Sequence, residues 1–288
     1  MSIKNKIKAH IRKYTRNYKC IDGSFAKLNR VNLEWWSQKR NVGDCISPVV
    51  CEYMLSLKGL SLQSRVKRTC HLTAVGSVCG AGFFDSVVWG SGIHHQVLMD
   101  HVKKLKGMRK LDIRAVRGPE TEKYLNEIGI SCPKIYGDPA IIMPEIYKHE
   151  PSCNKKYPVS LVVHISMKGS TDVPEGIHLI DIETADYRTF IDELCDSEKV
   201  ISSSLHGIIL SESYGIPAVF YSKGMDDQMM KYKDWYYSTG RRNFKYTNNL
   251  KEAIAMEPEP LPHLNEMRKS LKEAFPYDIF NTNRNILE

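Results

Sequence analysis

Residues 199–221 constrain the fold more than any other stretch of this sequence. Lys199–Ser202 reads as a short buried strand, Leu205–Tyr214 as an amphipathic helix and Ile216–Tyr221 as a second strand. Strands that alternate with helices in this way form parallel sheets. The turn Ser202–Ser204 therefore lies where a strand ends and a helix begins. Unpaired backbone N–H groups and the helix dipole favour an anion at such a position.

The histidine of this turn places a proton donor beside the predicted anion site. His206 carries the one common side chain that exchanges a proton near neutral pH, and Gly207 allows the backbone to approach a ligand closely. A phosphate or carboxylate beside a proton donor is therefore the first hypothesis for this chain. A serine-capped helix with its histidine bonded to a nearby carbonyl group explains the same residues equally well.

The alternation of strands and helices extends over the rest of the chain. Strands are predicted at His71–Gly76, Ser86–Trp89, Leu111–Val116, Lys134–Tyr136, Val159–Ile165 and Ile177–Asp181, and helices from Ser47-Pro48 onward and at Pro119–Ile128, Asp186–Asp196, Gln228–Tyr237 and Leu264–Phe275. The segment Tyr147–Pro158 reads as a linker. We therefore predict an α/β protein with domains at 1–150 and 151–288, whose last helix is free to return to the first domain. Ligand is expected at the carboxyl ends of the strands.

Several further polar residues follow predicted strands, and each has a plainer interpretation. Arg114 and Arg117 form a potential fork for a carboxylate or phosphate, or a surface ion pair. Asp138 orients a sugar hydroxyl or a catalytic side chain, or only forms an Asp-Pro turn. His164 lies in an apolar strand, where a packed histidine is the commoner outcome.

The remaining candidates lie in an aromatic and glycine-rich setting. Trp89 stacks on a sugar or belongs to the core, and it is followed by Gly90, Ser91 and His94. The pair Arg241 and Arg242 follows an aromatic cluster and holds a diphosphate or covers a surface.

Composition and missing motifs exclude several classes of protein. The net charge of +8 suits acidic small molecules, anionic lipid or nucleic acid, but no nucleic-acid signature is present, so no nucleic-acid partner is predicted. The eight cysteines form no CxxC pair, and the sequence lacks HExxH, GxGxxG and P-loop patterns. We therefore predict free thiols, no metal site and no cofactor. Without a signal peptide or apolar span, a cytoplasmic location is expected.

The first twenty residues form a separate segment. Isoleucines and tyrosines recur at helical spacing among lysines and arginines, and no acidic residue interrupts them. Residues 1–19 of this basic amphipathic helix could make a peripheral contact with the inner face of an anionic membrane. The alternative is a surface helix that docks its apolar stripe on its own domain or on a partner.

Six short motifs, in order, resemble the polysaccharide pyruvyl transferases, especially bacterial exopolysaccharide members. They are Asn41-Val42-Gly43-Asp44, Val88-Trp89-Gly90-Ser91-Gly92, Val116-Arg117-Gly118-Pro119-Glu120-Thr121, Tyr136-Gly137-Asp138-Pro139-Ala140, Ser203-Ser204-Leu205-His206-Gly207 and Tyr214-Gly215-Ile216-Pro217-Ala218. The resemblance spans roughly residues 35 to 245 of this chain. It implies two Rossmann-like domains in a GT-B-like arrangement.

The resemblance also implies a reaction. The enolpyruvyl unit of phosphoenolpyruvate, as donor substrate, is transferred to a sugar of a polysaccharide or lipid-linked repeat unit, and a pyruvate ketal forms with release of phosphate. The family's catalytic histidine carries over to His206 and its strand-end arginine to Arg117. Some members have arginine where this chain has Ser204, so Arg241, Arg242 and Lys223 are the substitute cations predicted here.

The predicted site thus comprises two catalytic residues and a set of binding residues. His206 and Arg117 are the catalytic pair, and the predicted substrate-binding residues are Asn41, Asp44, Gly90, Ser91, His94, Asp138, His164, Ser202, Ser203, Ser204, Gly207, Arg241 and Arg242. A nucleotide-sugar glycosyltransferase of the same architecture is the alternative enzyme. A non-catalytic subunit of a polysaccharide assembly complex is the second alternative.

Overall fold

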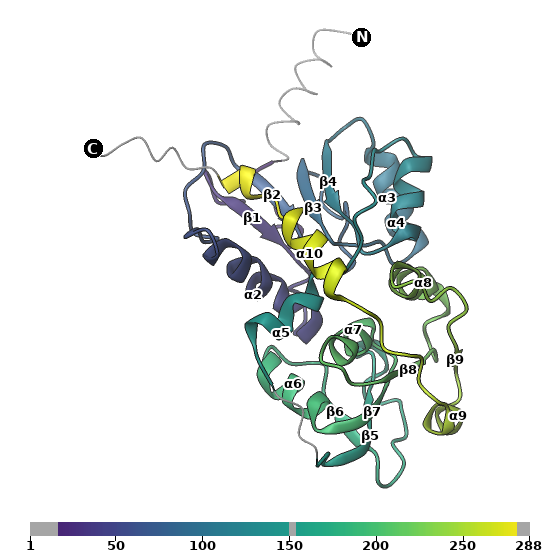
Figure 1. Cartoon of the computed structure of the whole chain (residues 1–288). Helices are drawn as coiled ribbons and strands as arrows, with labels where there is room; N and C mark the ends of the chain where they lie inside the picture. Colours follow the sequence, from purple (N-terminus) through teal and green to yellow (C-terminus); the bar gives the residue numbers. More distant parts are fainter. Residues whose placement is uncertain (1–16, 150–153, 281–288) are drawn as a thin grey trace.

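Two parallel sheets form the framework of the protein (Figure 1). The computed structural model describes residues 17–149 and 154–280. The first sheet contains β1 (Val31–Glu34), β2 (Cys70–Thr73), β3 (Ser86–Trp89) and β4 (Leu111–Ala115) in the order β1-β2-β3-β4. The second contains β5 (Tyr157–Val162), β6 (His178–Ile180), β7 (Ser197–Ser202), β8 (Ala218–Tyr221) and β9 (Tyr246–Thr247) in the order β6-β5-β7-β8-β9. The predicted α/β class is confirmed, and the two sheets are consistent with two Rossmann-like domains.

Helices are interleaved with these strands. They are α2 (Val42–Ser56), α3 (Gln96–Leu105), α4 (Pro119–Glu127), α5 (Met143–Ile146), α6 (Tyr187–Cys195), α7 (Leu205–Ser213), α8 (Met229–Ser238), α9 (Leu250–Ala255) and α10 (Asn265–Glu273). Short 3₁₀ turns lie at η1 (Pro139–Ile142), η2 (Ile165–Met167), η3 (Asp226–Gln228) and η4 (Tyr277–Phe280).

The order of the second sheet defines where a ligand is expected. Chain order reverses between β5 and β7, because β6 lies on the outer side of β5. A crevice forms at the carboxyl ends of the strands at such a switch point. His164 follows β5 and Ser204 follows β7, so both residues lie at this position.

The prediction for α2 was wrong about its start. The helix begins at Val42 rather than at Ser47-Pro48, because the Asn41 side chain accepts a hydrogen bond from the Gly43 N–H and caps the first turn. Pro48 lies inside the helix, where its missing N–H leaves one carbonyl of the first turn without the usual partner.

Other elements also differ from the sequence-based expectation. The predicted strand Lys134–Tyr136 is reduced to a single bridge between Val116 and Tyr136. The strand β1 and the helix α3 were missed. Helix α7 is buried along its whole length rather than amphipathic, since it packs between the second sheet and η1.

The two halves of the chain make several direct contacts. The last helix, α10, crosses back to the first sheet (Figure 1), where the Trp89 indole N–H donates to the Leu271 carbonyl oxygen at 2.8 Å. Arg268, also on α10, donates to the Ile141 carbonyl oxygen at 2.7 Å. On the other side α4 packs against α8. The boundary at residue 150 and the GT-B-like arrangement stay predictions.

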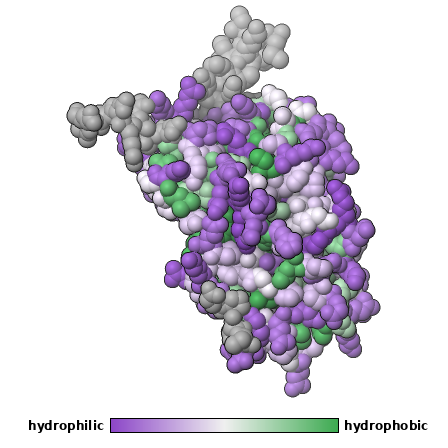
Figure 2. Space-filling model, viewed as in Figure 1, coloured by the Kyte–Doolittle hydropathy of each residue, from purple (hydrophilic) through white to green (hydrophobic). Residues whose placement is uncertain are grey.

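Hydrophilic side chains cover most of the face shown in Figure 2, with scattered hydrophobic residues between them. In residues 17–149 and 154–280, no helix is both long enough and apolar enough to cross a bilayer. The predicted basic helix, apart from its last few residues, lies outside the described residues, and its membrane contact stays a prediction.

Candidate active site

A cavity of about 590 Å³ lies between the two halves of the chain. This volume suits a small-molecule site. Loops that follow strands of both sheets line it, as expected for parallel sheets. The first half contributes Trp36, Lys39, Asn41, Asp44, Ser77, His94, His95 and His101, among others, and the second half contributes His164, Ser204, His206, Gln228 and Lys231.

His206 occupies the first turn of α7 and is held from two sides. A Cβ atom on Gly43 would overlap its imidazole, so the glycine lets the start of α2 approach the ring closely. On the other side, Nε2 lies 3.6 Å from Oδ2 of Asp138. Asp138 is fully buried, and its Oδ1 accepts a hydrogen bond from the Ala140 N–H, which fixes the carboxylate at the start of η1.

These two facing atoms are both buried and lack a hydrogen-bond partner among the described residues. A carboxylate that faces a histidine in this way orients the ring. Catalytic hydrogen bonds are often long before substrate binds, so the separation of 3.6 Å needs only a small closure. Asp138 is therefore better described as a partner of His206 than as an ordinary turn residue.

The serine turn divides into two structural residues and one that faces the cavity. The Ser202 hydroxyl donates to the Ser204 carbonyl oxygen, and the Ser203 hydroxyl accepts from the His164 N–H, so both are engaged inside the protein. Ser204 lines the cavity. Gly207 is needed for packing rather than for ligand approach, because a Cβ there would overlap the Ser202 hydroxyl.

Lys231 on α8 is the buried cation of the cavity, and the sequence-based analysis missed it. Its Nζ donates to Gln228 Oε1 at 2.6 Å and lies 3.5 Å from Nε2 of His164. Burial and the nearby Arg117 charge lower the pKa of Lys231 to about 7, against the opposing effect of Asp44. An arriving anion would offset both effects and restore its full charge.

Two histidines near Lys231, His164 and His94, are neutral at physiological pH. Burial, followed by the charge of Lys231, lowers the pKa of His164 to about 3. Burial and the adjacent His95 lower the pKa of His94 to about 3 as well. Both rings therefore offer hydrogen bonds to a ligand rather than charge.

Asp44 lies beside these residues on the first turn of α2. Burial raises its pKa to about 6, although the charges of His206 and Lys231 act in the opposite direction. A carboxylate with this pKa is ionised at neutral pH and is still basic enough to accept a proton. Asn41, which lines the same cavity, caps the helix that carries Asp44.

Arg117 lies behind the cavity wall, fully buried. Its Nη1 donates to Ser77 Oγ at 2.7 Å, its Nη2 donates to the Ile93 carbonyl oxygen, and its Nε lies 3.4 Å from Oδ2 of Asp234 on α8. Ser77, but not the guanidinium, lines the cavity. The geometry thus makes Arg117 a support for the wall and a link between the halves.

Two other residues that were predicted to bind substrate also have structural roles. The Ser91 hydroxyl donates to the Gly76 carbonyl oxygen and accepts from the Val78 N–H. Gly90 has φ +79°, and a Cβ there would overlap Pro139, so the glycine allows close packing against the turn that carries Asp138.

The predicted arginine pair does not reach the cavity. The Arg241 Nη2 donates to buried Glu212 at 2.8 Å, and Arg242 lies over the Tyr237 ring. Lys223, the third substitute cation, lines a separate hollow with Thr171 and Asn248.

The plainer interpretations apply to two further residues. Trp89 belongs to the core, where it packs edge-to-face on Phe275. Arg114 forms ion pairs with Asp112 and Asp278 at the surface.

The residues missed from the sequence lie outside recognisable motifs. Lys231 is a lysine in a helix rich in lysine and tyrosine, with nothing local to mark it as buried. Trp36 and Lys39 follow β1, which was itself missed, although a strand prediction there would have placed them at a carboxyl end.

The described residues form an α/β protein with a candidate ligand cavity at the carboxyl edges of two parallel sheets. Residues 78–222, half of the chain, match the sequence profile of the polysaccharide pyruvyl transferase family. The chain belongs to this family, and the predicted resemblance is confirmed.

Two relatives extend the comparison beyond that segment. The succinoglycan biosynthesis protein ExoV of Rhizobium meliloti (strain 1021) is 25% identical over 215 residues, which cover 72% of this chain and 64% of that protein. The uncharacterized protein L143 of Acanthamoeba polyphaga mimivirus is 25% identical over 198 residues, which cover 66% of this chain and 67% of that protein. The match thus spans about two thirds of each relative.

Proposed function

We propose that this protein transfers the enolpyruvyl unit of phosphoenolpyruvate to two hydroxyls of a saccharide, forming a pyruvate ketal and releasing phosphate. One observation carries the proposal. A single cavity is lined by His206, whose ring faces buried Asp138, by a carboxylate with a raised pKa and by a buried lysine. Membership of the family supports a transferase that acts on a saccharide in polysaccharide biosynthesis.

The reaction requires a proton at one carbon and a nucleophile at the next. In this proposal the imidazolium of His206 delivers a proton to C3 of the enol, and C2 gains oxocarbenium character. A sugar hydroxyl forms a bond to C2, the C2–O bond to phosphate breaks, and a second hydroxyl closes the ketal. Of the two hydroxyl protons, one replaces the proton that His206 gave to C3 and the other leaves with phosphate.

Asp44 is the proposed base that takes the proton of the attacking hydroxyl and passes it to the departing phosphate. Asp44 lines the same cavity as His206. The raised pKa of its carboxyl group suits the role of base, whereas His206 has the role of acid. Asp138 faces His206 and orients its ring, whereas half-buried Asp44 can reach a bound hydroxyl.

Lys231 is the proposed cation for the donor, in place of the arginine pair. Lys231 lies beside His164 and lines the same cavity as Ser204 at the start of α7. Lys39 lines the same cavity from the first half of the chain and is a second cation available to the donor. Preorganised charges of this kind stabilise the negative charge that develops on the departing phosphate.

The test is phosphate release from phosphoenolpyruvate in the presence of galactosides, glucosides and mannosides, with product mass measured in parallel. Wild type should release phosphate only with a suitable acceptor and add the mass of a pyruvate ketal. Lys231→Met should raise KM for phosphoenolpyruvate at least tenfold, about the effect of one lost charge-assisted contact. Lys223→Met, from the separate hollow, should behave as wild type.

Two other results would assign a different function. Turnover of a nucleotide sugar without phosphoenolpyruvate would identify a glycosyltransferase. Binding of saccharides with no turnover of either donor would identify a non-catalytic subunit.

A further inference from the structure

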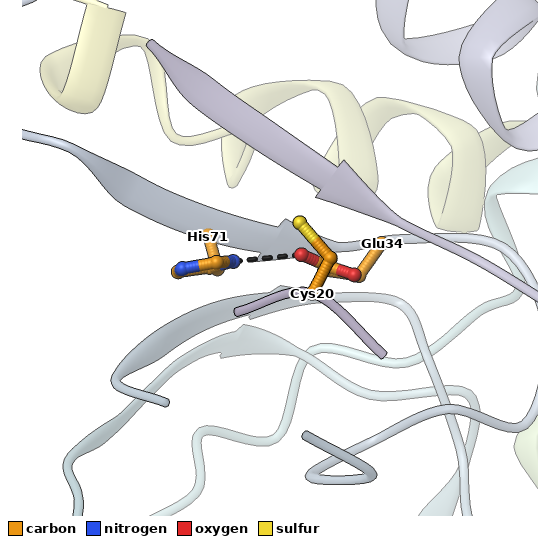
Figure 3. A group of neighbouring side chains, drawn as sticks. All are labelled: Cys20, Glu34 and His71. Atoms are coloured by element: carbon orange, nitrogen blue, oxygen red, sulfur yellow. Dashed lines mark hydrogen bonds and ion pairs between the residues drawn. The ribbon is translucent and has the colours of Figure 1, made fainter. Parts of the chain in front are cut away.

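A second cluster of potential ligand atoms lies apart from the cavity described above. Cys20, Glu34 and His71 come from the segment before β1, from β1 itself and from β2. One ligand atom from each lies within 4.8 Å of the others. Figure 3 shows the thiol and the imidazole both turned toward the carboxylate of Glu34.

The hydrogen bonds of His71 indicate that a positive charge belongs in this cluster. Its Nε2 lies 2.9 Å from the Asn17 carbonyl oxygen, which can only accept, so this nitrogen carries a proton. Its Nδ1 lies 2.7 Å from Oε1 of Glu34. In neutral imidazole this second nitrogen carries a lone pair and no proton. Nδ1 and Oε1 would then both be acceptors, and two acceptors this close need a proton or a metal ion between them.

The surroundings also have the form of a metal site. A metal-bound histidine usually donates its other N–H to a carbonyl group, as His71 does to Asn17, and a ligating carboxylate is usually held by a further donor. Glu34 Oε2 accepts from the Ile21 N–H at 2.9 Å. The Phe84 ring stacks on the imidazole with centroids 3.7 Å apart and fixes its plane.

We propose that Cys20, Glu34 and His71 bind one zinc ion. Thiolate, imidazole and carboxylate together form a donor set that zinc prefers, with a fourth position for water. Ligand atoms around tetrahedral zinc lie about 3.5 Å apart, as follows from bond lengths of about 2.0–2.3 Å. Small side-chain rotations bring the three atoms to that spacing.

Zinc binds the thiolate and the imidazole lone pair, so the thiol proton and the proton between His71 and Glu34 leave to solvent when the ion binds. Cys20 and Glu34 also line a hollow of about 340 Å³, through which an ion can reach them.

The zinc would anchor the segment before β1 to the first sheet. Ile21, the residue after Cys20, lines the main cavity, so the anchor fixes one edge of the candidate active site. The proposal does not depend on the reaction, because its ligands lie outside that cavity.

Metal binding by the full chain tests the proposal directly. After treatment with a chelator, the protein is titrated with Co²⁺, and zinc retained after dialysis and desalting is measured by mass spectrometry. We expect one zinc per chain and, with cobalt, a thiolate-to-metal charge-transfer band. Cys20→Ser should abolish the band and weaken zinc binding at least about 100-fold, since even partners of ligands cost about 10- to 100-fold. Cys70, next to His71 in the sequence, also has a half-buried thiol, so Cys70→Ser is the matched control. This variant should keep the charge-transfer band and the zinc affinity of wild type.

A thermal measurement separates loss of metal from loss of fold. Metal-free Cys20→Ser should unfold at the temperature of metal-free wild type, and zinc should raise the unfolding temperature of wild type alone. Glu34→Gln, which keeps the shape of the side chain, should also lose the zinc-induced shift. Zinc retained equally by wild type and Cys20→Ser, a cobalt spectrum without a thiolate band, or no retained metal in wild type would each overturn the proposal.

Discussion

Oδ2 of Asp138 lies 3.6 Å from Nε2 of His206, and both atoms are buried. The two residues come from different halves of the chain, one from the turn into η1 and the other from the first turn of α7. Their meeting therefore depends on the fit between the halves as much as on either loop. This relationship makes His206 the best-supported proton donor of the cavity.

Substitution of His206 tests the proton-transfer step. His206→Ala should lower kcat about 10²- to 10⁴-fold, the range for loss of a general acid or base. The measurement is acceptor-dependent phosphate release under saturating donor. His149→Ala, whose imidazole pairs with Asp192 outside the cavity, should leave kcat unchanged. Equal rates for wild type and His206→Ala would assign the proton donor to another residue.

Gly43→Ala tests the packing that holds the imidazole. The added methyl group would overlap the His206 ring and move it away from Asp138. A displacement of about 1 Å can cost about 100-fold in rate, so we expect a loss of that size in kcat with a folded protein. Ser47→Ala on the same helix is the control, because its buried hydroxyl has no hydrogen-bond partner in the described part of the chain. Full activity in Gly43→Ala would contradict this account of the ring's position.

Donor binding should weaken as pH rises. Lys231, whose pKa is lowered to about 7, is protonated below that value and loses its charge above it. KM for phosphoenolpyruvate should therefore be lowest below about pH 7 and rise on the alkaline side. In Lys231→Arg the rise should move to higher pH, because guanidinium keeps its proton. Identical pH profiles of KM in the two proteins would exclude Lys231 as the donor cation.

The buried pair between Arg117 and Asp234 should contribute strongly to stability. Asp234 also accepts from the N–H and hydroxyl of Thr121, so Asp234→Asn leaves a buried guanidinium without its counter-charge. We expect a loss of about 3–5 kcal/mol in the free energy of unfolding, measured with denaturant. Arg114→Gln, which breaks partly exposed ion pairs, should cost no more than about 1 kcal/mol. Similar losses in both variants would contradict the burial of the first pair.

Local patterns predicted the parts of the fold that local residues determine. The ends of β3 and the start of α7 were placed correctly, since apolar runs and turn residues mark them directly. The prediction for α2 failed because proline is common at the first helical position and Pro48 therefore indicated a later start. The capping hydrogen bond of Asn41 forms only in the folded turn, so the sequence alone does not reveal it.

The candidate site was predictable as far as it rests on strand ends. His206, Asp138, Asp44, Asn41, His94, His164 and Ser204 meet or adjoin in one cavity or its wall. Lys231 was not predictable, because its burial arises from packing between two halves that are far apart in sequence. The same holds for Cys20 and His71, which pair with Glu34 across 14 and 37 residues and form no short motif.

Helix α8 takes part in both the cavity and the contact between halves. Lys231 lines the cavity, and Asp234, less than one turn further along, holds Arg117 of the other half. A ligand that shifts this helix must also change the strength of the Arg117–Asp234 interaction. By thermodynamic linkage, a substitution that breaks this interaction must change the binding free energy of that ligand by the amount that the ligand changes the interaction. Affinity at Lys231 is in this sense a property of both halves of the chain.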